Sequence, residues 1–367
     1  MKIPAQDDDA TVVVRRPAAI PPSAASPPPP RPRGRLGLAA GGAGAVILAG
    51  VLAWVLWPRP VPQLPAPAPV AKPAPASVAP PSAVRPAPTP AAPPAPAPAA
   101  PLAIATITAD EATIRDHAAD RLTVFRFAAD PSVIVLDFPT LHMQGAMLNR
   151  LAALIEKAGA PRDRVLTDAE LAATISKGGD TPDTYYYGHD YSAAAVARFF
   201  ALADAQRVRL TPEEGTLRAM ATQFGWFAPD AVGALISVSH VPDPAAPTLD
   251  EAARAAILHH ELSHGLFFSD PVYAAYVRQF WDTSLTEAER DSVRRFLGSE
   301  GYDMADEALM YNEMQAYVLF TYDPRFCKPG DFGMTPARRL EVAEAFLRDM
   351  PPSWLRDSLA EGITRLR

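Results

Sequence analysis

The hydrophobic pattern begins with one long apolar segment close to the N-terminus. Residues 36–57 form a stretch of 22 positions without a charged side chain, and it ends with Trp54 and Trp57. A helix of this length rises about 1.5 Å per residue, enough to cross a hydrocarbon core of about 30 Å. Tryptophan is enriched where such helices meet the membrane surface. The segment therefore predicts one transmembrane helix.

Charged residues around this segment predict its orientation. Five arginines precede it and only Arg59 follows closely, so the positive-inside rule keeps the N-terminus in the cytoplasm. A cleaved signal peptide is the alternative, but its apolar region is usually about 7–15 residues long and Pro58 and Pro60 follow here at once. We therefore expect an uncleaved signal anchor. The alanine-, proline- and arginine-rich composition indicates a bacterial inner membrane, with the residues after the anchor in the periplasm.

Short β-like runs alternate with long helical patterns further along the chain. Runs rich in β-branched and aromatic side chains cover residues 122–127, 132–138 and 231–240, which is typical of strands. Apolar positions spaced three and four apart indicate helices. These helices are predicted at residues 140–158, 192–205, 254–268, 271–283, 304–322 and 336–348. The predicted fold class is α+β and helix-dominated.

Five Thr-x-x-Glu sequences mark expected helix starts, because such a pair can satisfy backbone N–H groups reciprocally at a helix N-terminus. One of them precedes the helix predicted at residues 254–268. The pairs are Thr108/Glu111, Thr167/Glu170, Thr211/Glu214, Thr248/Glu251 and Thr286/Glu289.

Proline separates the chain into two parts. The first 101 residues hold 27 of the 42 prolines, and 18 of these lie among alanines in residues 58–101. Such a composition cannot form a core and favours polyproline II. We therefore expect a disordered cytoplasmic tail at residues 1–35 and a stiff linker at 58–101. A globular region follows at 102–367, either as one domain or as two lobes, 102–230 and 231–367.

The globular region is acidic. The first 101 residues sum to about +6 and the whole chain to −7, which leaves about −13 for the remainder. A negative charge of this size opposes nucleic-acid binding. The single cysteine, Cys327, excludes an intramolecular disulfide and a multi-cysteine metal cluster.

The strongest chemical signal is the sequence H-E-L-S-H at positions 260–264. Residues four apart share one face of a helix, so His260 and His264 can present two imidazoles to one zinc ion. Glu261 lies one step round the helix, where it can take a proton from a water bound to that ion. The apolar stripe that buries this helix is predicted to consist of Leu258, Leu262 and Leu266.

A catalytic zinc also needs a third protein ligand and an open position for water. The neighbouring His259 points about 100° away from His260, so we expect it to pack or to support the site rather than to bind the ion. Glu313 is the best candidate, because it stands among apolar residues of a helix, where a carboxylate is costly to bury without a cation. A salt bridge between Glu313 and an arginine is the alternative.

These residues resemble the gluzincin group of zinc metallopeptidases. That group combines H-E-x-x-H on one helix with a glutamate on a second helix, often within N-E-x-x-A or E-x-x-A. The second pattern is matched here by N-E-M-Q-A at positions 312–316. The resemblance covers residues 231–322.

The resemblance implies a zincin-like metallopeptidase domain with a small sheet. It implies a zinc ion bound by His260, His264 and Glu313, and it implies that Glu261 acts as general base and acid. It also implies that residues 233–240 are the sheet edge along which a substrate adds as a strand.

The sequence departs from the group's pattern in two places. His264 and Glu313 are 49 positions apart, more than in the compact members, so a helical hairpin at 271–283 and 286–297 must be inserted. Those members also have an aspartate four residues after the glutamate, where it orients a histidine, and here that position is Tyr317. The resemblance therefore does not imply which residues hydrogen-bond the metal ligands and orient them.

Asp270 is a competing third ligand. It stands six residues after His264, where metzincins place theirs. Metzincins need a glycine three residues after the second histidine to turn the chain, and here that position is Phe267. Asp270 followed by Pro271 is typical of a helix start, so we prefer Glu313.

The combined prediction is a membrane-anchored, zinc-dependent peptidase that hydrolyses an unidentified peptide or protein and contacts the lipid bilayer through one helix. Two alternatives stay open, an inactive zincin-like scaffold of the envelope and a hydrolase of peptidoglycan stem peptides. His189 and the tyrosines at 184–191, together with Tyr311 and Tyr317, could donate to an oxyanion or could simply pack, and no role is assigned to them.

Overall fold

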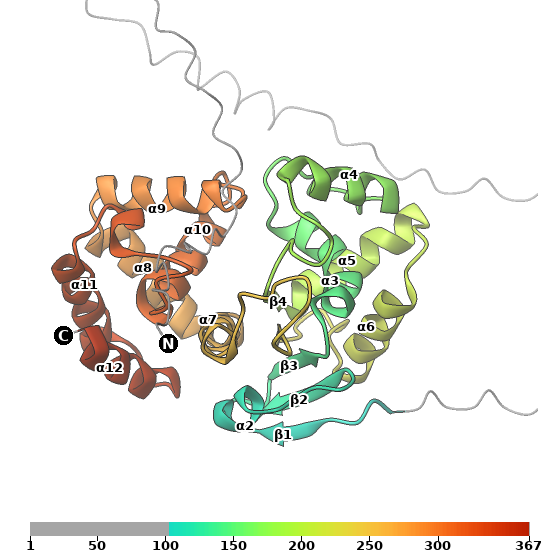
Figure 1. The fold of residues 1–367 in the computed structure, drawn as a ribbon, viewed down its shortest axis with the longest axis horizontal. Coiled ribbons are helices and arrows are strands. Elements are labelled where there is room, and N and C mark those ends of the chain that lie inside the picture. Colours follow the sequence, from blue (N-terminus) through green and yellow to red (C-terminus); the bar gives the residue numbers. More distant parts are fainter. Residues whose placement is uncertain (1–102, 367) are drawn as a thin grey trace, which may run out of the picture. The chain divides into compact units, whose positions relative to one another are not determined.

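A five-stranded mixed sheet lies at the centre of the part of the chain that the structure describes. The structure is a computed structural model, and it describes residues 103–366. The sheet has the order β1-β2-β3-β5-β4, and Figure 1 labels β1, β2, β3 and β4. Strands β1 and β2 pair in parallel, as do β3 and β5, whereas the β2–β3 and β5–β4 pairs are antiparallel. The strands are β1 (Ile107–Ala109), β2 (Thr123–Phe127), β3 (Val133–Phe138), β4 (His189–Ser192) and β5 (Ala234–Ser239).

Alternate residues of the central strands face two different cores, because successive side chains of a strand point to opposite faces. Ile134 and Leu136 of β3 pack into a core shared with helices on one face of the sheet. Val133 and Val135 belong to a second core on the other face. The helices on the first face are α3 (Leu141–Ile155), α4 (Asp168–Gly178), α5 (Ala193–Gln206) and α6 (Pro212–Gln223).

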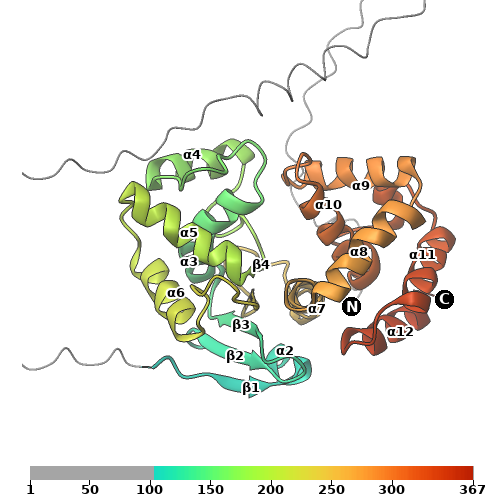
Figure 2. The same cartoon turned by 180° about the vertical axis from the view of Figure 1, so that it is seen from behind.

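Helix α7 (Glu251–Ser269) covers the second face of the sheet and separates it from the C-terminal helices (Figures 1 and 2). Leu258 and Leu262 pack against the sheet, whereas Leu266 packs into the core of the C-terminal helices. The predicted apolar stripe is therefore confirmed. Gly265 allows close packing here, because a Cβ at this position would lie 3.0 Å from Val133 Cγ1.

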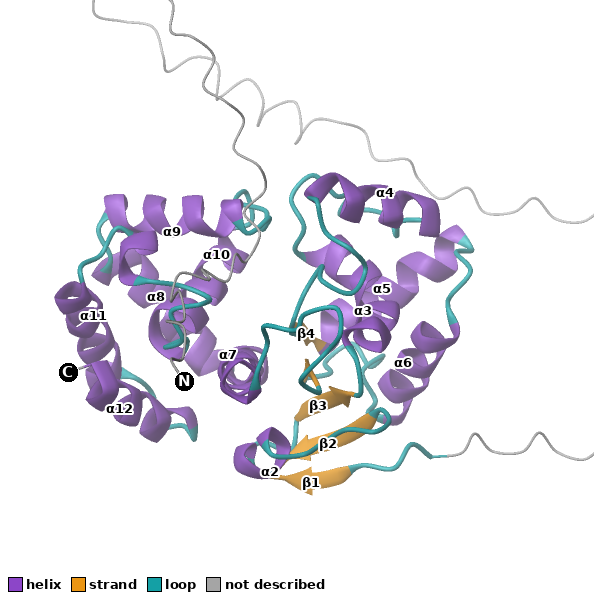
Figure 3. Ribbon diagram, in the orientation of Figure 1, coloured by secondary structure: helices purple, strands orange, loops and turns teal. Residues whose placement is uncertain are grey.

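The C-terminal part is wholly helical, as Figure 3 shows. Its elements share one large apolar core. They are α8 (Pro271–Ser284), α9 (Glu287–Ser299), α10 (Glu307–Met314), the π-helix η1 (Gln315–Phe320), the 3₁₀-helix η2 (Pro329–Phe332), α11 (Pro336–Asp349) and α12 (Leu355–Leu366). The α8–α9 pair is the hairpin predicted between His264 and Glu313.

Three of the five predicted capping boxes are present, at the starts of α4, α6 and α9. The other two predictions are wrong. Helix α2 (Glu111–Arg115) is capped by Asp110 and α7 by Asp250, each of which accepts a backbone N–H three residues on. An aspartate closer to the helix competed with the threonine in both cases, and Thr108 lies in β1 instead.

The prediction that residues 233–240 form a sheet edge is also wrong. They correspond to β5, which lies between β3 and β4. The edge strand on that side is β4, which is four residues long. The sequence indicates only a polar-aromatic cluster there, not a strand. Because β5 comes from the second predicted lobe and its two neighbours come from the first, both lobes contribute to one sheet.

The described residues form a helix-dominated α+β unit, as predicted for the fold class. Within residues 103–366, no helix is both long enough and apolar enough to span a bilayer. The tail, anchor and linker predicted at 1–35, 36–57 and 58–101 lie outside the described residues.

Candidate metal centre

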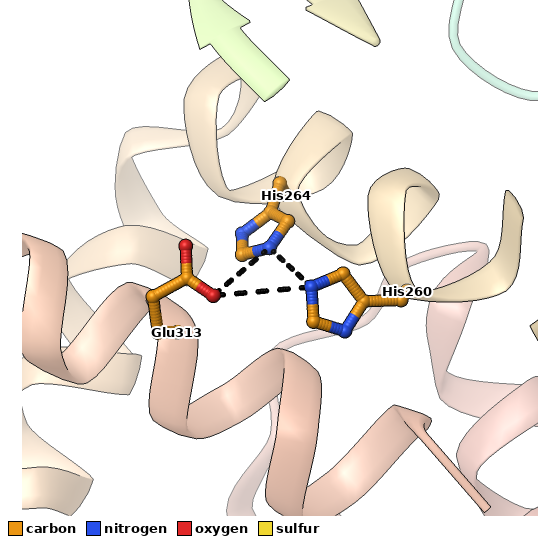
Figure 4. Close-up of side chains that lie close together, drawn as sticks. All are labelled: His260, His264 and Glu313. Atoms are coloured by element: carbon orange, nitrogen blue, oxygen red, sulfur yellow. Dashed lines mark hydrogen bonds and ion pairs between the residues drawn. The ribbon is translucent and has the colours of Figure 1, made fainter. Parts of the chain in front are cut away.

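Two helices bring two imidazoles and one carboxylate together (Figure 4). His260 and His264 are one turn apart on α7, and Glu313 lies near the end of α10. The two Nε2 atoms are 3.1 Å apart, and each lies 3.8 Å from Glu313 Oε2. The structure thus brings together the three residues that the sequence predicts as metal ligands.

The tautomer of His260 follows from its hydrogen-bond partner. Its Nδ1 lies 2.8 Å from Thr321 Oγ1, and that hydroxyl donates its proton to the Ala316 carbonyl. The hydroxyl therefore accepts from His260, and Nδ1 carries the N–H. Thr321 directly follows the π-helix η1, whose wider turn brings this hydroxyl to the imidazole; such insertions are frequent at functional sites.

The tautomer of His264 is fixed in the same way. Its Nδ1 lies 3.0 Å from Asn312 Oδ1 and 3.5 Å from Asp190 Oδ2. The Asn312 atom that faces Nδ1 is the amide oxygen, which can only accept a hydrogen bond. Nδ1 therefore carries the proton in His264 as well.

Both neutral imidazoles consequently present a lone pair at Nε2. Two acceptors 3.1 Å apart cannot hydrogen-bond each other. Burial lowers the pKa of His260 well below its usual range, and the nearby His264 imidazole lowers it further, so a shared proton is disfavoured. A cation between the two Nε2 atoms would satisfy both lone pairs.

Glu313 completes this unsatisfied group. Its side chain is fully buried, and neither carboxylate oxygen makes a hydrogen bond of ordinary geometry among the described residues. Burial raises the pKa of Glu313 well above its usual range, nearby carboxylates raise it further, and the Tyr302 hydroxyl opposes them. A buried carboxylate in this state is costly unless it is paired with a cation.

The spacing of the three atoms fits a metal ion. They lie on a circle with a radius of about 2.1 Å, which is close to the distance of about 2.0–2.2 Å at which nitrogen and oxygen ligands bind zinc. His260, His264 and Glu313 could therefore hold a metal ion.

A second group that could hold a metal ion consists of Asp190, Glu261 and His264. It shares His264 with the first group. Because the Nδ1 atom of His264 carries a proton, this residue can offer only Nε2, which already faces His260 and Glu313. One ion at Nε2 is therefore the better account, and Asp190 supports His264 through the proton on Nδ1.

Glu261 lies beside the ligands and beneath the backbone that leads into β4. It is 6% exposed, and its Oε2 atom has no hydrogen-bond partner among the described residues. A Cβ on Gly188 would lie 2.1 Å from Glu261 Oε1, so a larger residue there would displace the carboxylate. Burial raises the pKa of Glu261 well above its usual range, and the Asp190 and Glu156 carboxylates raise it further. The group is thus suited to accept a proton.

Sequence reasoning missed three groups near the site. Asp190 and Glu156 are buried acids whose pKa burial raises, and Thr321 holds His260. Asp190 stands in the aromatic cluster at 184–191, while Glu156 and Thr321 stand at the ends of helices without any motif. Asn312 was visible only as part of N-E-M-Q-A.

A cavity of about 600 Å³ opens next to the ligands. It is lined by His260, Glu261, Tyr317, Lys157 and the tyrosine run Tyr185–Tyr187, among others. A molecule in this cavity could therefore reach Glu261.

The remaining sequence candidates lie outside the metal group. His259 faces away from the site, as expected. Asp270 caps α8 by accepting the N–H groups of Val272 and Tyr273, so it takes no part in the metal group. His189 is buried and pairs with Tyr191, and burial lowers its pKa to about 3. Tyr317 packs edge-on against His260 and lines the cavity, whereas Tyr311 packs on Phe267.

Comparisons with known proteins give no relative from which a function could be inferred. No known protein family, no characterised protein and no solved structure matches the chain. The arrangement of the residues is therefore the basis for any functional proposal.

Proposed function

We propose that this protein is a zinc-dependent peptidase, anchored in the bacterial inner membrane by residues 36–57, with its catalytic domain in the periplasm. The observation that carries the proposal is the convergence of two Nε2 lone pairs and one unpaired carboxylate beside a buried glutamate. Three ligands of this kind, with room for a water, are the usual protein contribution to a catalytic zinc site.

The donor set favours zinc over harder cations. Two imidazoles and one carboxylate suit zinc, whereas magnesium and calcium prefer oxygen ligands. A zinc ion held there would lower the pKa of a water and polarise a substrate carbonyl. His260, His264 and Glu313 would hold it, with Thr321 and Asn312 fixing the orientations of the two rings.

Glu261 is the residue proposed to move protons. Its raised pKa and its unpartnered Oε2 atom suit it to take a proton from water and return it to the leaving amine. Gly188 lies close to the same carboxylate, since even a Cβ there would collide with its Oε1 atom. A close neighbour of this kind limits the movement of a catalytic group and keeps it in a productive position.

A peptide is the substrate class that the surroundings support. The backbone that leads into β4 lines the cavity at Tyr187 and Gly188, next to Glu261. An extended peptide can bind along exposed backbone through main-chain hydrogen bonds, and in this cavity it would lie beside Glu261.

Metal content of the purified full chain tests the proposal. We expect one zinc per chain after dialysis against a weak chelator, retained in Glu261→Gln and lost in His264→Ala and Glu313→Ala. His259→Ala is the matched control, because that imidazole lies next to His260 but outside the group, and it should retain zinc. A folded chain that binds no zinc would overturn the proposal.

Hydrolysis distinguishes the peptidase from its two alternatives. We expect zinc-dependent cleavage of a fluorogenic peptide library by the native chain, and a rate about 10²–10⁴-fold lower in Glu261→Gln. Retained zinc without cleavage of any peptide would favour an inactive scaffold. Cleavage of muropeptides alone would assign the hydrolase to peptidoglycan stem peptides.

A further inference from the structure

The cavity beside the metal group has an acidic lining. Asp180, Asp183, Glu261 and Glu300 contribute carboxylates to it, and among the described residues that line it Lys157 is the only lysine or arginine. Asp183 pairs with His142 at 3.0 Å. Even without Glu261, three carboxylates line the cavity against one ammonium group, so the lining as a whole is negative. This favours a positively charged guest over a neutral or negative one.

The cavity is also lined by aromatic ring faces. Tyr185 and Tyr186 stand in the run that leads to Gly188, and the Lys157 ammonium lies 4.5 Å from the first ring centroid and 5.0 Å from the second. An ammonium over a tyrosine ring within about 6 Å is attracted by the electrons of the ring face. The protein's own lysine thus already shows that these rings accept an alkylammonium group.

An unpartnered group points to the same place. Tyr185 is 5% exposed and lines the cavity, and its hydroxyl has no hydrogen-bond partner among the described residues. Buried tyrosine hydroxyls usually have a partner. A hydroxyl oxygen accepts hydrogen bonds, so a guest with N–H donors could provide one once the lining shifts enough to uncover this buried atom.

We propose that this cavity binds a positively charged peptide side chain, lysine or arginine. His260 and Glu261 line the same cavity, so the bound side chain belongs to a residue next to the bond that is cleaved. That position rests on the peptidase function proposed above, whereas the preference for a positive charge rests on the cavity alone.

Binding of matched peptides to the zinc-loaded full chain carrying Glu261→Gln tests this proposal without cleavage. The probes are acetyl-Ala-Ala-X-Ala-Ala-amide peptides, in which X is lysine, arginine, norleucine or glutamate. Their blocked ends leave the side chain as the only difference. We expect the lysine and arginine peptides to bind about tenfold more tightly than the norleucine peptide, and the glutamate peptide to bind most weakly.

Variants locate the effect in the cavity. Asp180→Asn should weaken binding of the lysine peptide about fivefold, and Lys157→Met should strengthen it, because an internal competitor for the ring faces is removed. Asp230→Asn is the matched control, since Asp230 is exposed and does not line the cavity, and it should change nothing. Equal binding of the lysine and norleucine peptides would overturn the proposal.

The outcomes separate this inference from the proposed function. If the native chain cleaves peptides without any preference for a basic residue, the inference fails and the peptidase stands. If the basic peptides bind preferentially but no peptide is cleaved, the cavity is correctly described and the peptidase is wrong.

Discussion

The two sides of α7 carry neighbouring histidines in opposite situations. On one side, His259 has both ring nitrogens paired, with Nδ1 2.9 Å from Glu111 Oε1 and Nε2 2.9 Å from Ser358 Oγ. On the other side, His260 has a partner at Nδ1, but its Nε2 faces a second lone pair. One imidazole joins three helices, and the other leaves a ligand atom free.

This difference shows what distinguishes a candidate metal ligand from a structural histidine on the same helix. The residue type and burial of the two histidines are similar, and one position along the chain separates them. What distinguishes them is whether the protein supplies a partner for every polar atom, because buried polar groups are normally satisfied. Nε2 of His260 is therefore available to a metal ion.

The largest expected effect follows from removing Glu313. The native chain should gain about 4 kcal/mol of unfolding free energy at zinc a thousandfold above its dissociation constant, and Glu313→Met should gain none. In EDTA, which removes zinc, the Glu313→Met variant should be more stable than the native chain by about 1–3 kcal/mol of unfolding free energy. The reason is that a buried unpaired carboxyl is replaced by an apolar side chain. Urea unfolding in both buffers measures this. A less stable variant in EDTA would mean that Glu313 has a protein partner.

A smaller effect is expected for the group that supports His264. Asn312→Ala removes the acceptor from its Nδ1–H and should weaken zinc affinity about 10–100-fold, as losses of outer partners do. Competition with a chromophoric chelator measures the affinity. Gln279→Ala, an exposed amide on α8, is the control, and an equal loss there would contradict the role of Asn312.

Gly188→Ala should act on Glu261 and spare the metal. The added Cβ collides with the Glu261 carboxylate, so we expect the rate of peptide cleavage to fall about tenfold through misplacement of that group, with zinc content unchanged. Gly215→Ala on α6 is the matched control, because a Cβ there meets no atom within 4 Å. Unchanged cleavage by Gly188→Ala would show that this contact does not position Glu261.

The smallest expected effect belongs to the satisfied side of α7. His259→Ala removes its hydrogen bonds to Glu111 and Ser358 and should lower the unfolding free energy by about 1–2 kcal/mol. The activity of the zinc-loaded chain should stay within about twofold of the native rate. A large loss of activity at equal zinc content would mean that the two sides of the helix are coupled.

Local patterns were enough to predict much of the fold and the central residues of the site. Spacing along one helix placed His260 and His264 together, and apolar surroundings singled out Glu313 as a carboxylate that needs a cation. Three capping boxes and the α8–α9 hairpin followed from equally local signals. Each of these inferences uses residues within a few turns of one another.

The rest depends on contacts between distant segments. Asp190 reaches His264 only because β4 pairs with β5, and a four-residue polar strand has too weak a pattern to be recognised. Thr321 reaches His260 through a π-helical turn, which the α-helical spacing of residues 304–322 does not indicate. The contact between Gly188 and Glu261 follows from tertiary packing alone.

Helix α7 contributes both to the core on the sheet and to the core of the C-terminal helices, and this has a consequence for how the protein unfolds. The imidazoles lie on α7, where Leu258 and Leu262 pack on the sheet, whereas Glu313 comes from α10 within the core of the C-terminal helices. An ion bound by all three residues is a cross-link between these cores. Loss of the ion should let the C-terminal helices open independently, so their amides would exchange with deuterium sooner than those of β3 and β5.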